Sequence, residues 1–277
     1  MTSQGRRLSF SKHEGAGNDF LVLVDRGGRC RLGEVEARAL CDRHLGIGAD
    51  GLITVRPGSG GADLTMELRN ADGGKAEMSG NGIRCLAQAA VDAGLVRSGR
   101  FTVATDAGVR TVEYRPAERP GRAWASVVMG EVVVGEEEPH PVEGWRARRV
   151  DVGNPHLVLL GPDPDSVDVA TVGRRVEAAQ PGGVNVEFVA TGPGRDELRL
   201  RVWERGVGET LACGTGSCAA AAAAHRWGLV GERVQVHNPG GVLEVVLGEE
   251  DGDPVVLAGP VRRVAEVTVD LDLVATS

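Results

Sequence analysis

Aromatic residues are scarce in the sequence, and lysine is nearly absent. Only 3% of the 277 residues are Phe, Trp or Tyr, whereas 42% are hydrophobic, so a core must be built mainly from aliphatic side chains. The lysines are Lys12 and Lys75, beside 29 arginines. Lys75 lies in the turn-like segment NADGGKAEM, where solvation is expected. Since pyridoxal phosphate enzymes need a lysine for their Schiff base, this scarcity argues against that cofactor.

Other classes of protein are disfavoured by what the chain lacks. The six histidines form no HExxH or His-x-His pair and the five cysteines form no CxxC pair, so we expect neither a metal nor a disulfide framework. A net charge of −8 offers no basic footprint for nucleic acid or an anionic membrane surface. No apolar run approaches the roughly 20 residues of a membrane span. Because residues 1–15 also lack the apolar core of a signal peptide, we expect a cytoplasmic protein.

The sequence contains an internal repeat whose period is about half its length. Asn18, which precedes the strand-like run FLVLV, returns 136 residues later as Asn154 before HLVLL. Asp50 in GADGLITV matches Asn185 in GVNVEFVA at a spacing of 135, and this correspondence is the weakest. Landmarks that keep their order and spacing indicate a duplicated domain.

The strongest correspondence is a glycine-rich turn that opens a helix. SGNGIRCLAQAAVDAGLV at 79–96 matches CGTGSCAAAAAAHRWGLV at 213–230, with every position offset by 134. A strand, a turn and a second strand follow in both halves, at 100–109 and 233–242. The two halves are therefore predicted to share one topology, and chance similarity of glycine-rich turns is the alternative.

The pattern of elements predicts an α+β protein in which strands dominate. Alternating runs such as TVEYR indicate antiparallel sheet, while 34–43 and 217–227 indicate helices. The segment 115–123 contains the Pro, Gly and charged residues typical of a linker. We place the first domain at residues 1–121 and the second at 122–261.

Cys213 immediately precedes the predicted helix of the second half. The unpaired N–H groups and positive dipole end of a helix can lower a cysteine pKa from about 8.5 into the range of roughly 3.5–7.5. We therefore expect a depressed pKa for the Cys213 thiol. The neighbouring glycines would leave backbone N–H groups free to bind a carboxylate. The alternative is that Cys213 is a buried structural thiol.

The equivalent turn of the first half begins at Ser79 and is expected to face Cys213 across a cleft between the domains. Two helix N-termini could then bind one carboxylate and place an α-carbon between two catalytic groups. Such a site would remove the α-proton from one face and return it on the other, without a cofactor.

Several separated motifs resemble those of diaminopimelate epimerases, and together they cover nearly the whole chain. They are GAGNDF at 15–20, GIGADGL at 46–52, RNADG at 69–73, GNGIRC at 80–85, GNPH at 153–156, VNVEF at 184–188, ERGVGET at 204–210 and ACGTGSCA at 212–219. Proline racemases share the fold and the two-thiol chemistry but have different motifs. The resemblance implies two similar hotdog-like domains, each an antiparallel-rich sheet wrapped around a central helix, with the active site in the cleft between them. It also implies that residues 262–277 return to the first domain.

The implied activity is the interconversion of LL- and meso-diaminopimelate without pyridoxal phosphate, in lysine and cell-wall precursor biosynthesis. The resemblance assigns catalysis to Cys213, Ser79, His156 and Glu204. It assigns substrate binding to Asn18, Asn70, Gly80, Asn81, Asn154, Asn185, Glu204, Arg205, Gly214 and Thr215. The backbone of the two helix turns would bind the reacting carboxylate, Glu204 the reacting ammonium, and the other asparagines with Arg205 the far end of the substrate. The implied partner is a small diamino acid, and a homodimer is compatible with the sequence.

Each of these residues also has a structural interpretation. Asn in a Gly-Asn turn often serves only the turn. Arg205 could be a solvated surface charge, and His156 a satisfied core residue. Their joint occurrence in the family order favours the functional interpretation.

The chain departs from the family pattern at Ser79, where the family has its first catalytic cysteine. Cys85 corresponds to a second, non-catalytic cysteine of the motif, as Cys218 does in the other half. A serine hydroxyl is not appreciably ionised at neutral pH without an adjacent base. Gly51 also stands where many members carry glutamine, which bears on recognition of the far end of the substrate.

Three interpretations of Ser79 follow: an inactivated variant, a natural epimerase whose serine works slowly or with help, or one-base chemistry. Hydroxyproline dehydratases of the wider superfamily, in which a hydroxyl residue replaces one thiol, illustrate the third. The competing functions are a one-base dehydratase or racemase, a catalytically dead diamino-acid binding module, and a structural protein that retains only the fold. An enzyme would exchange the substrate α-proton with deuterated solvent, whereas a binding module would bind without exchange.

Overall fold

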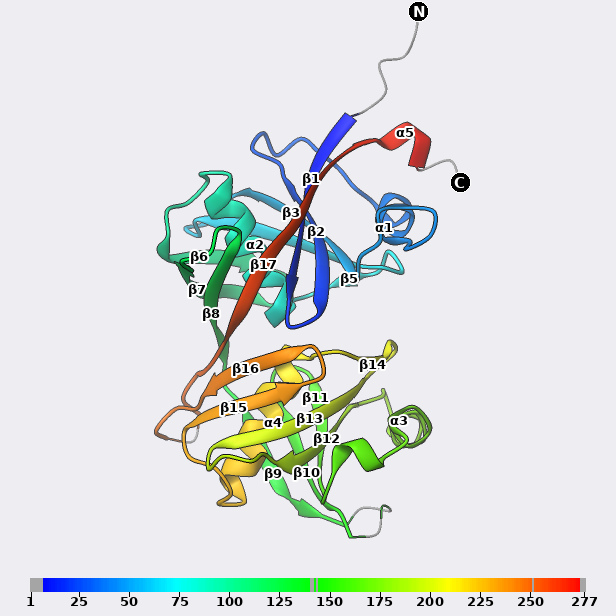
Figure 1. Ribbon diagram of the computed structural model, residues 1–277, viewed down its shortest axis with the longest axis vertical. Helices are drawn as coiled ribbons and strands as arrows, with labels where there is room; N and C mark the ends of the chain where they lie inside the picture. Colours follow the sequence, from blue (N-terminus) through cyan, green and yellow to red (C-terminus); the bar gives the residue numbers. More distant parts are fainter. Residues whose placement is uncertain (1–6, 140–141, 143, 251, 275–277) are drawn as a thin grey trace, which may run out of the picture. The chain divides into compact units, whose positions relative to one another are not determined.

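The computed structural model describes residues 7–139, 142, 144–250 and 252–274, and it divides the chain into two compact units (Figure 1). Unit 1 comprises Met1–Val127 and Pro260–Ser277, and unit 2 comprises Val128–Gly259. The last strand, β17 (Val255–Asp270), contributes to both. Its first residues pair with β16 and its later residues pair with β1, from Arg7 opposite Asp270 to Glu14 opposite Arg262.

Unit 1 is a mainly antiparallel sheet with helices packed on it. The order of paired strands begins with β17 and continues through β1, β2, β3, β4, β6, β7 and β8, with β2–β3 and β4–β6 parallel. The strands are β1 (Arg7–Gly15), β2 (Asn18–Val24), β3 (Gly51–Pro57), β4 (Leu64–Asn70), β5 (Lys75–Ala76), β6 (Gly99–Thr105), β7 (Gly108–Pro116) and β8 (Arg122–Gly130). The helices are α1 (Glu34–Cys41), α2 (Gly80–Asp92) and the short α5 (Leu271–Val274).

Unit 2 repeats this plan. Paired strands run in the order β9, β10, β11, β12, β13, β15, β16 and β17, with β11–β12 and β13–β15 parallel. The strands are β9 (Val133–Glu138), β10 (Arg146–Asp151), β11 (Pro155–Leu160), β12 (Asn185–Thr191), β13 (Glu197–Glu204), β14 (Gly208–Thr210), β15 (Arg233–Asn238) and β16 (Gly241–Val246). The helices are η1 (Pro164–Ser166), α3 (Val169–Ala178), which the sequence did not suggest, and α4 (Gly214–Arg226).

Each unit encloses one central helix, as the predicted fold class requires. Eleven of the 13 residues of α2 are buried, and α2 packs against β1, β2, β3, β4 and β7. Ten of the 13 residues of α4 are buried, most of them alanines, and α4 packs against the strands of unit 2 (Figure 1). A helix that is buried all round must lie inside its domain rather than on one face of it. The two hotdog-like domains expected from the sequence are therefore confirmed.

The duplication is confirmed in detail by the two helices and the hairpins that follow them. The helices begin at Gly80 and Gly214, at the predicted spacing of 134, and have the same length. The hairpins β6–β7 and β15–β16 then turn at Thr105 and at Asn238. Helix α4 begins at Gly214, earlier than the predicted position 217, because Cys213 is the N-cap and both Gly214 and Gly216 belong to the first turn.

Two details of the sequence-based interpretation require correction. The segment 115–123 is the turn of the β7–β8 hairpin, in which Pro116 pairs with Ala123, and the chain passes between units within β8. Pro and Gly mark tight turns as readily as linkers, so composition alone misled. The counterpart of Asn185 is Gly51 and not Asp50, because Phe20 lies opposite Gly51 just as His156 lies opposite Asn185.

Among the described residues, none of the helices combines the length and the apolar character needed to cross a membrane.

Candidate functional site

The side chains of Ser79 and Cys213 cap the two central helices in the same way. Ser79 Oγ accepts a hydrogen bond from the N–H of Gly82 at 3.0 Å. Cys213 Sγ accepts one from the N–H of Gly216 at 3.3 Å. Both residues are in extended backbone conformation, as an N-cap requires, and both accept from the third residue of the helix. The predicted equivalence of these two groups is therefore a feature of the fold.

The protonation state of Cys213 differs from the sequence-based expectation. Burial raises the pKa of the Cys213 thiol well above its usual range, and the carboxylates of Glu204 and Glu187 raise it further. Hydrogen bonds with Thr215 and with the N–H of Gly216 lower this pKa without offsetting the increase. The expected depressed pKa is therefore wrong, because the helix end was considered without the burial of the thiol and without the acidic side chains that β12 and β13 bring to it. Cys213 is a protonated thiol at neutral pH.

Glu204 ends β13 beside Cys213. Burial raises the pKa of this carboxyl group, and the charge of Glu187 also raises it. Hydrogen bonds with Thr210 and with the Cys213 thiol lower the same pKa, as does the charge of His156. The carboxyl group of Glu204 therefore shares a hydrogen bond with the thiol and has a raised affinity for a proton, which suits it to exchange a proton with Cys213.

His156 lies on β11 and is only 1% exposed. Its Nδ1 is 2.6 Å from Oε1 of Glu187, and its Nε2 is 3.0 Å from Oδ1 of Asn154. Both side chains of the His156–Glu187 pair have a relative exposure of 0%. The pair lies in the interior of unit 2, close to the first turn of α4.

Asn185 and Arg205 are linked to each other. Asn185, at the start of β12, donates to the carbonyl of Pro155 at 3.1 Å and accepts from the N–H of Arg205 at 2.9 Å. The Arg205 side chain is exposed, and it donates to the carbonyl of Gly182 at 3.3 Å. Asn185 therefore fixes the backbone from which Arg205 projects.

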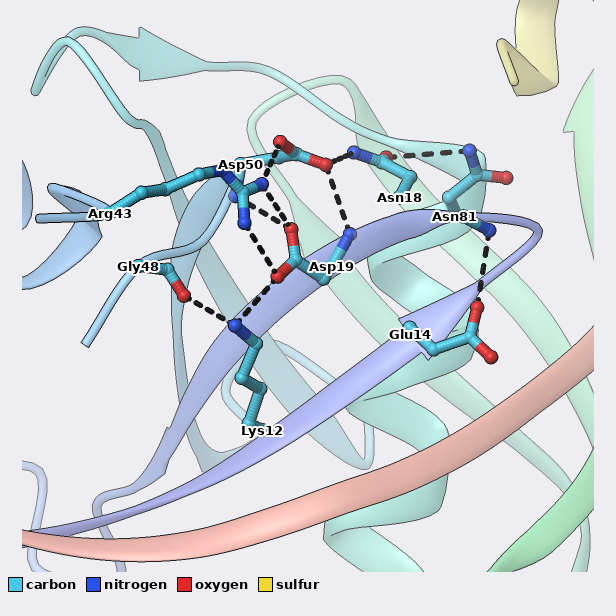
Figure 2. A network of polar contacts seen from close by, with 9 residues as sticks. Lys12, Glu14, Asn18, Asp19, Arg43, Gly48, Asp50 and Asn81 are labelled. Carbon is cyan, nitrogen blue, oxygen red and sulfur yellow. Dashed lines mark hydrogen bonds and ion pairs between the residues drawn. The ribbon is translucent and has the colours of Figure 1, made fainter. Parts of the chain in front are cut away.

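In unit 1, the predicted binding residues Asn18 and Asn81 belong to one polar network (Figure 2). The amide of Asn81 donates to Oδ1 of Asn18 at 3.4 Å, and the amide of Asn18 donates to Oδ2 of Asp50 at 2.6 Å. The side chain of Arg84, fully buried in α2, donates to Oδ1 of Asn81 at 2.9 Å and to the carbonyl of Gly80 at 3.0 Å. The first turn of α2 is therefore connected to the start of β2 and to the loop before β3.

Charged side chains extend this network on the other side of Asp50. Arg43 donates to Oδ1 of Asp19 and to Oδ1 of Asp50, each at 2.7 Å (Figure 2). Lys12 contacts Asp19 at 2.8 Å and donates to the carbonyl of Gly48 at 2.6 Å. Although burial alone would raise the pKa of Asp19, its contacts with Arg43 and Lys12 lower it below the ordinary value. Asp19 is therefore ionised at neutral pH, and Arg43 joins it to Asp50, which accepts from Asn18.

Asn70 is the counterpart of Glu204. Asn70 ends β4 opposite Gly51, just as Glu204 ends β13. In the hairpins that follow, Arg69 pairs with Lys75 and Trp203 pairs with Glu209, so that the second pair lies 134 residues after the first. The side chain of Asn70 is exposed.

The structure thus brings the predicted residues together in two groups. Unit 1 contains Ser79, Gly80, Asn81, Asn18 and Asn70, at the first turn of α2 and at the neighbouring ends of β2 and β4. Unit 2 contains Cys213, Gly214, Thr215, His156, Asn154, Glu204, Asn185 and Arg205, at the first turn of α4 and at the ends of β11, β12 and β13. The sequence-based interpretation did not single out Glu187 and Arg84, although both lie within its motifs, and it named Asp50 only as a landmark of the repeat.

Comparison with known proteins identifies one family. The family model described as diaminopimelate epimerase matches residues 10–134 and 148–264. The diaminopimelate epimerase of Acidovorax ebreus is 41% identical over 290 residues, which cover 95% of this chain and 98% of that protein. The diaminopimelate epimerase of Desulforudis audaxviator is 41% identical over 280 residues, which cover 93% and 97% respectively.

Solved structures of low sequence identity share the fold. A PhzF-family phenazine biosynthesis protein of Bacillus anthracis has a TM-score of 0.77 at 16% identity, and the match covers 95% of this chain and 99% of that one. A hydroxyproline epimerase of Agrobacterium vitis with bound trans-4-hydroxy-L-proline has a TM-score of 0.75 at 17% identity, with coverages of 98% and 95%.

Proposed function

Because the chain belongs to the diaminopimelate epimerase family, an isomerase family, we propose that it interconverts LL- and meso-diaminopimelate without a cofactor. The single observation that supports this reaction most strongly is the pair of equivalent helix caps, in which a thiol and a hydroxyl each accept from an N–H of the first helical turn. Epimerisation needs two proton-transfer groups for one carbon, and the duplicated fold supplies two such positions.

We assign the reacting carboxylate to the backbone of Gly80, Asn81, Gly214 and Thr215. The first-turn N–H groups of a helix have no intrahelical acceptor, and the positive dipole end favours an anion. As the α-proton leaves, negative charge moves onto this carboxylate. N–H groups aimed at it therefore stabilise the transition state more than the ground state.

Cys213 and Glu204 act together in this proposal. A protonated Cys213 can deliver a proton to the α-carbon, and it becomes a thiolate in doing so. When the reaction runs the other way, the thiol must first lose its proton, and Glu204 is the carboxyl group that hydrogen-bonds to it and has a raised pKa. While it is ionised, Glu204 also offers a negative charge to the reacting ammonium, and His156 supports these groups from β11.

Ser79 is the second proton-transfer group, and it is the weaker one. The N–H of Gly82 stabilises a negative charge on the Ser79 oxygen, yet a hydroxyl is a much weaker acid than a thiol. We propose that the step assigned to Ser79 limits turnover. The second candidate function, one-base chemistry at Cys213 as in a dehydratase or racemase, is favoured by this serine alone.

We assign the far end of the substrate to Asn18, Asn70, Asn154 and Arg205, with Asn185 acting through the backbone of Arg205. Arg205 supplies the planar fork that binds a carboxylate in two places. We further propose a diamino acid as the partner and the cytoplasm as the location. The five cysteines, of which we assign Cys213 to catalysis, form no disulfide among the described residues, which suits a reducing compartment.

The test measures whether the α-proton is exchanged with solvent and whether the configuration at the α-carbon changes. Either stereoisomer is incubated with the protein in deuterated solvent, and both the configuration and the deuterium at the α-carbon are measured by NMR and mass spectrometry. We expect deuterium in the product isomer, and Cys213→Ala should abolish its formation. Exchange with retained configuration would support one-base chemistry instead, and binding without exchange would identify a binding module.

A further inference from the structure

The buried pair formed by His156 and Glu187 has no polar counterpart in unit 1. When the strand pair β2–β3 is aligned with β11–β12, Phe20 occupies the position of His156 and Ile53 occupies the position of Glu187. Both are buried, with relative exposures of 4% for Phe20 and 0% for Ile53. The same fold therefore accepts two apolar side chains where unit 2 has an imidazole and a carboxylate.

The equivalence extends to the central helices. A methyl group added at Gly82 would lie 3.2 Å from Cδ1 of Ile53, and one added at Gly216 would lie 2.9 Å from Oε1 of Glu187. Ile53 and Glu187 thus fill the same space beneath the first turn of the helix, next to the capping residue. In unit 2 this space contains a carboxylate close to Gly216, whose N–H donates to Sγ of Cys213.

A buried ion pair is rarely retained for stability. Its desolvation penalty offsets its attraction, and a well-packed apolar pair of similar volume is often as stable or more stable. In addition, Oε2 of Glu187 has no hydrogen-bond partner among the described residues, which adds to the cost of burial. Unit 1 has the apolar Phe20 and Ile53 at these positions of the same fold, so the polar pair in unit 2 requires a functional explanation.

We propose that Glu187 is a positioning residue for the reaction at Cys213, acting through His156; this inference rests on the proposed function. An ionised carboxylate can only accept a hydrogen bond, so Glu187 fixes the proton of His156 on Nδ1 and fixes the plane of the ring. Nε2 then faces Oδ1 of Asn154, one of the residues assigned to substrate binding, at 3.0 Å, and because an amide oxygen only accepts, Nε2 is the donor of this second hydrogen bond. The N–H of His156 also offsets the negative charge that Glu187 places beneath the helix cap.

The primary test is Glu187→Gln, which keeps the shape of the side chain and removes its charge. We expect kcat to fall roughly 10–100-fold, the range found when a supporting hydrogen-bond partner is removed, with KM little changed. Glu187→Asp should restore part of the loss. Glu209→Gln, at a partly exposed carboxylate paired with Arg201, is the matched control and should leave kcat unchanged. An unaltered kcat in Glu187→Gln would overturn the proposal.

A second readout does not depend on turnover. In protein labelled with ¹⁵N-histidine, the ring nitrogens of His156 report which of them carries the proton. We expect Nδ1 to carry a proton throughout in the unaltered protein and only part of the time in Glu187→Gln. If no variant epimerises diaminopimelate, the proposed function fails while this spectrum still tests the pairing. A His156 spectrum that is the same in both proteins would overturn the positioning role.

The double variant Glu187→Ile with His156→Phe copies unit 1 and separates a catalytic role from a structural one. We expect it to fold with an unchanged or higher Tm and to have no measurable epimerisation. Glu187→Ile alone should lower Tm, because it leaves a buried imidazole without its carboxylate. A double variant that fails to fold would show that unit 2 needs the pair for its structure and would contradict the proposal.

Discussion

Ser79 and Cys213 are the same position of a duplicated fold, since each caps its central helix and accepts from the N–H three residues later, at 3.0 and 3.3 Å. The two groups therefore differ in chemistry and not in placement within their units. If epimerisation is limited by the hydroxyl, restoring a thiol should repair it without any other change.

Ser79→Cys should raise the rate of epimerisation by roughly 10²–10⁴-fold, the contribution typical of a well-placed acid or base. The rate is measured as the change of optical rotation or by chiral chromatography. Ser79→Ala is the matched control and should be no faster than the unaltered protein. An unchanged rate in Ser79→Cys would exclude the two-thiol mechanism for this chain.

Asp50→Asn should weaken substrate binding, since Asp50 holds the amide of Asn18 at 2.6 Å and also contacts Arg43. We expect KM to rise about 5-fold, or about 1 kcal/mol for a partly exposed charged hydrogen bond, with a smaller effect on kcat. Asp63→Asn, at an exposed carboxylate bonded to Thr102, is the control and should leave KM unchanged. Equal effects of the two variants would argue against a role for Asp50 in orienting Asn18.

Gly216→Ala should impair catalysis, and Gly82→Ala should not. Both glycines occupy the first turn of a central helix, where alanine favours helix formation by about 1 kcal/mol. The new methyl group would meet Cβ of the capping residue at 3.2 Å in both halves, but at 216 it would also press on Oε1 of Glu187 at 2.9 Å, whereas at 82 it would meet the flexible end of the Ile53 side chain at 3.2 Å. We expect kcat to fall several-fold only for Gly216→Ala, with similar Tm values for both, measured by steady-state kinetics and thermal unfolding. A larger loss of activity in Gly82→Ala would reverse the assignment.

Stability should decrease at alkaline pH because buried thiols are harder to ionise in the folded chain. Burial raises the pKa of Cys41 and of Cys85 to about 12, and that of Cys213 well above its usual range. Below about pH 8.5, the thiol pKa of an unfolded chain, these groups are protonated in both states and the stability they contribute is fully present. Above that pH only the unfolded chain releases the protons, so each thiol lowers the free energy of unfolding by about 1.4 kcal/mol per pH unit until the folded pKa is reached. Urea unfolding between pH 7 and 10.5 measures the slope, which should be shallower for Cys213→Ala; an equal slope would contradict the raised pKa of Cys213.

Iodoacetamide should label Cys213 slowly at neutral pH and faster as the pH rises above 9, because the thiolate is the reactive form. Mass spectrometry of the peptide containing residue 213 measures the rate. The exposed N-acetylcysteine thiol is the reference for an ordinary pH profile. A rate that levels off below pH 7 would restore the depressed pKa that the helix N-terminus alone suggests.

The sequence predicted the parts of the fold that depend on local pattern. The matching turns at Ser79 and Cys213 gave the duplication, the central helices and the capping positions, because glycines and small residues at fixed spacing determine a helix start. Composition did not distinguish a hairpin turn from a linker at 115–123, since Pro and Gly serve both. The comparison of the halves also matched Asn185 with Asp50 instead of Gly51, an error of one residue. Strand register is set by pairing across the sheet and cannot be read along the chain.

Residues whose role depends on distant neighbours were missed or misjudged. The charge around Cys213 comes from Glu187 and Glu204, which lie on separate strands, so the effect on its pKa could not be inferred from the helix end. Glu187 stands between the apolar Val186 and Phe188, and the one sequence signal for it was its polarity at a position where unit 1 has Ile53. Comparing the halves residue by residue in the correct register would have found it.

Strand β17 has a consequence for the order in which the chain can fold during synthesis. Unit 2 consists of one continuous stretch and is complete once residue 259 has left the ribosome, whereas unit 1 needs residues 260–277 as well as 1–127. The half that is made first must therefore wait for residues 260–270 before β1, already paired with β2, acquires β17 as its second neighbour. A chain truncated after residue 259 and released should accordingly contain a protease-resistant second half and a protease-sensitive first half.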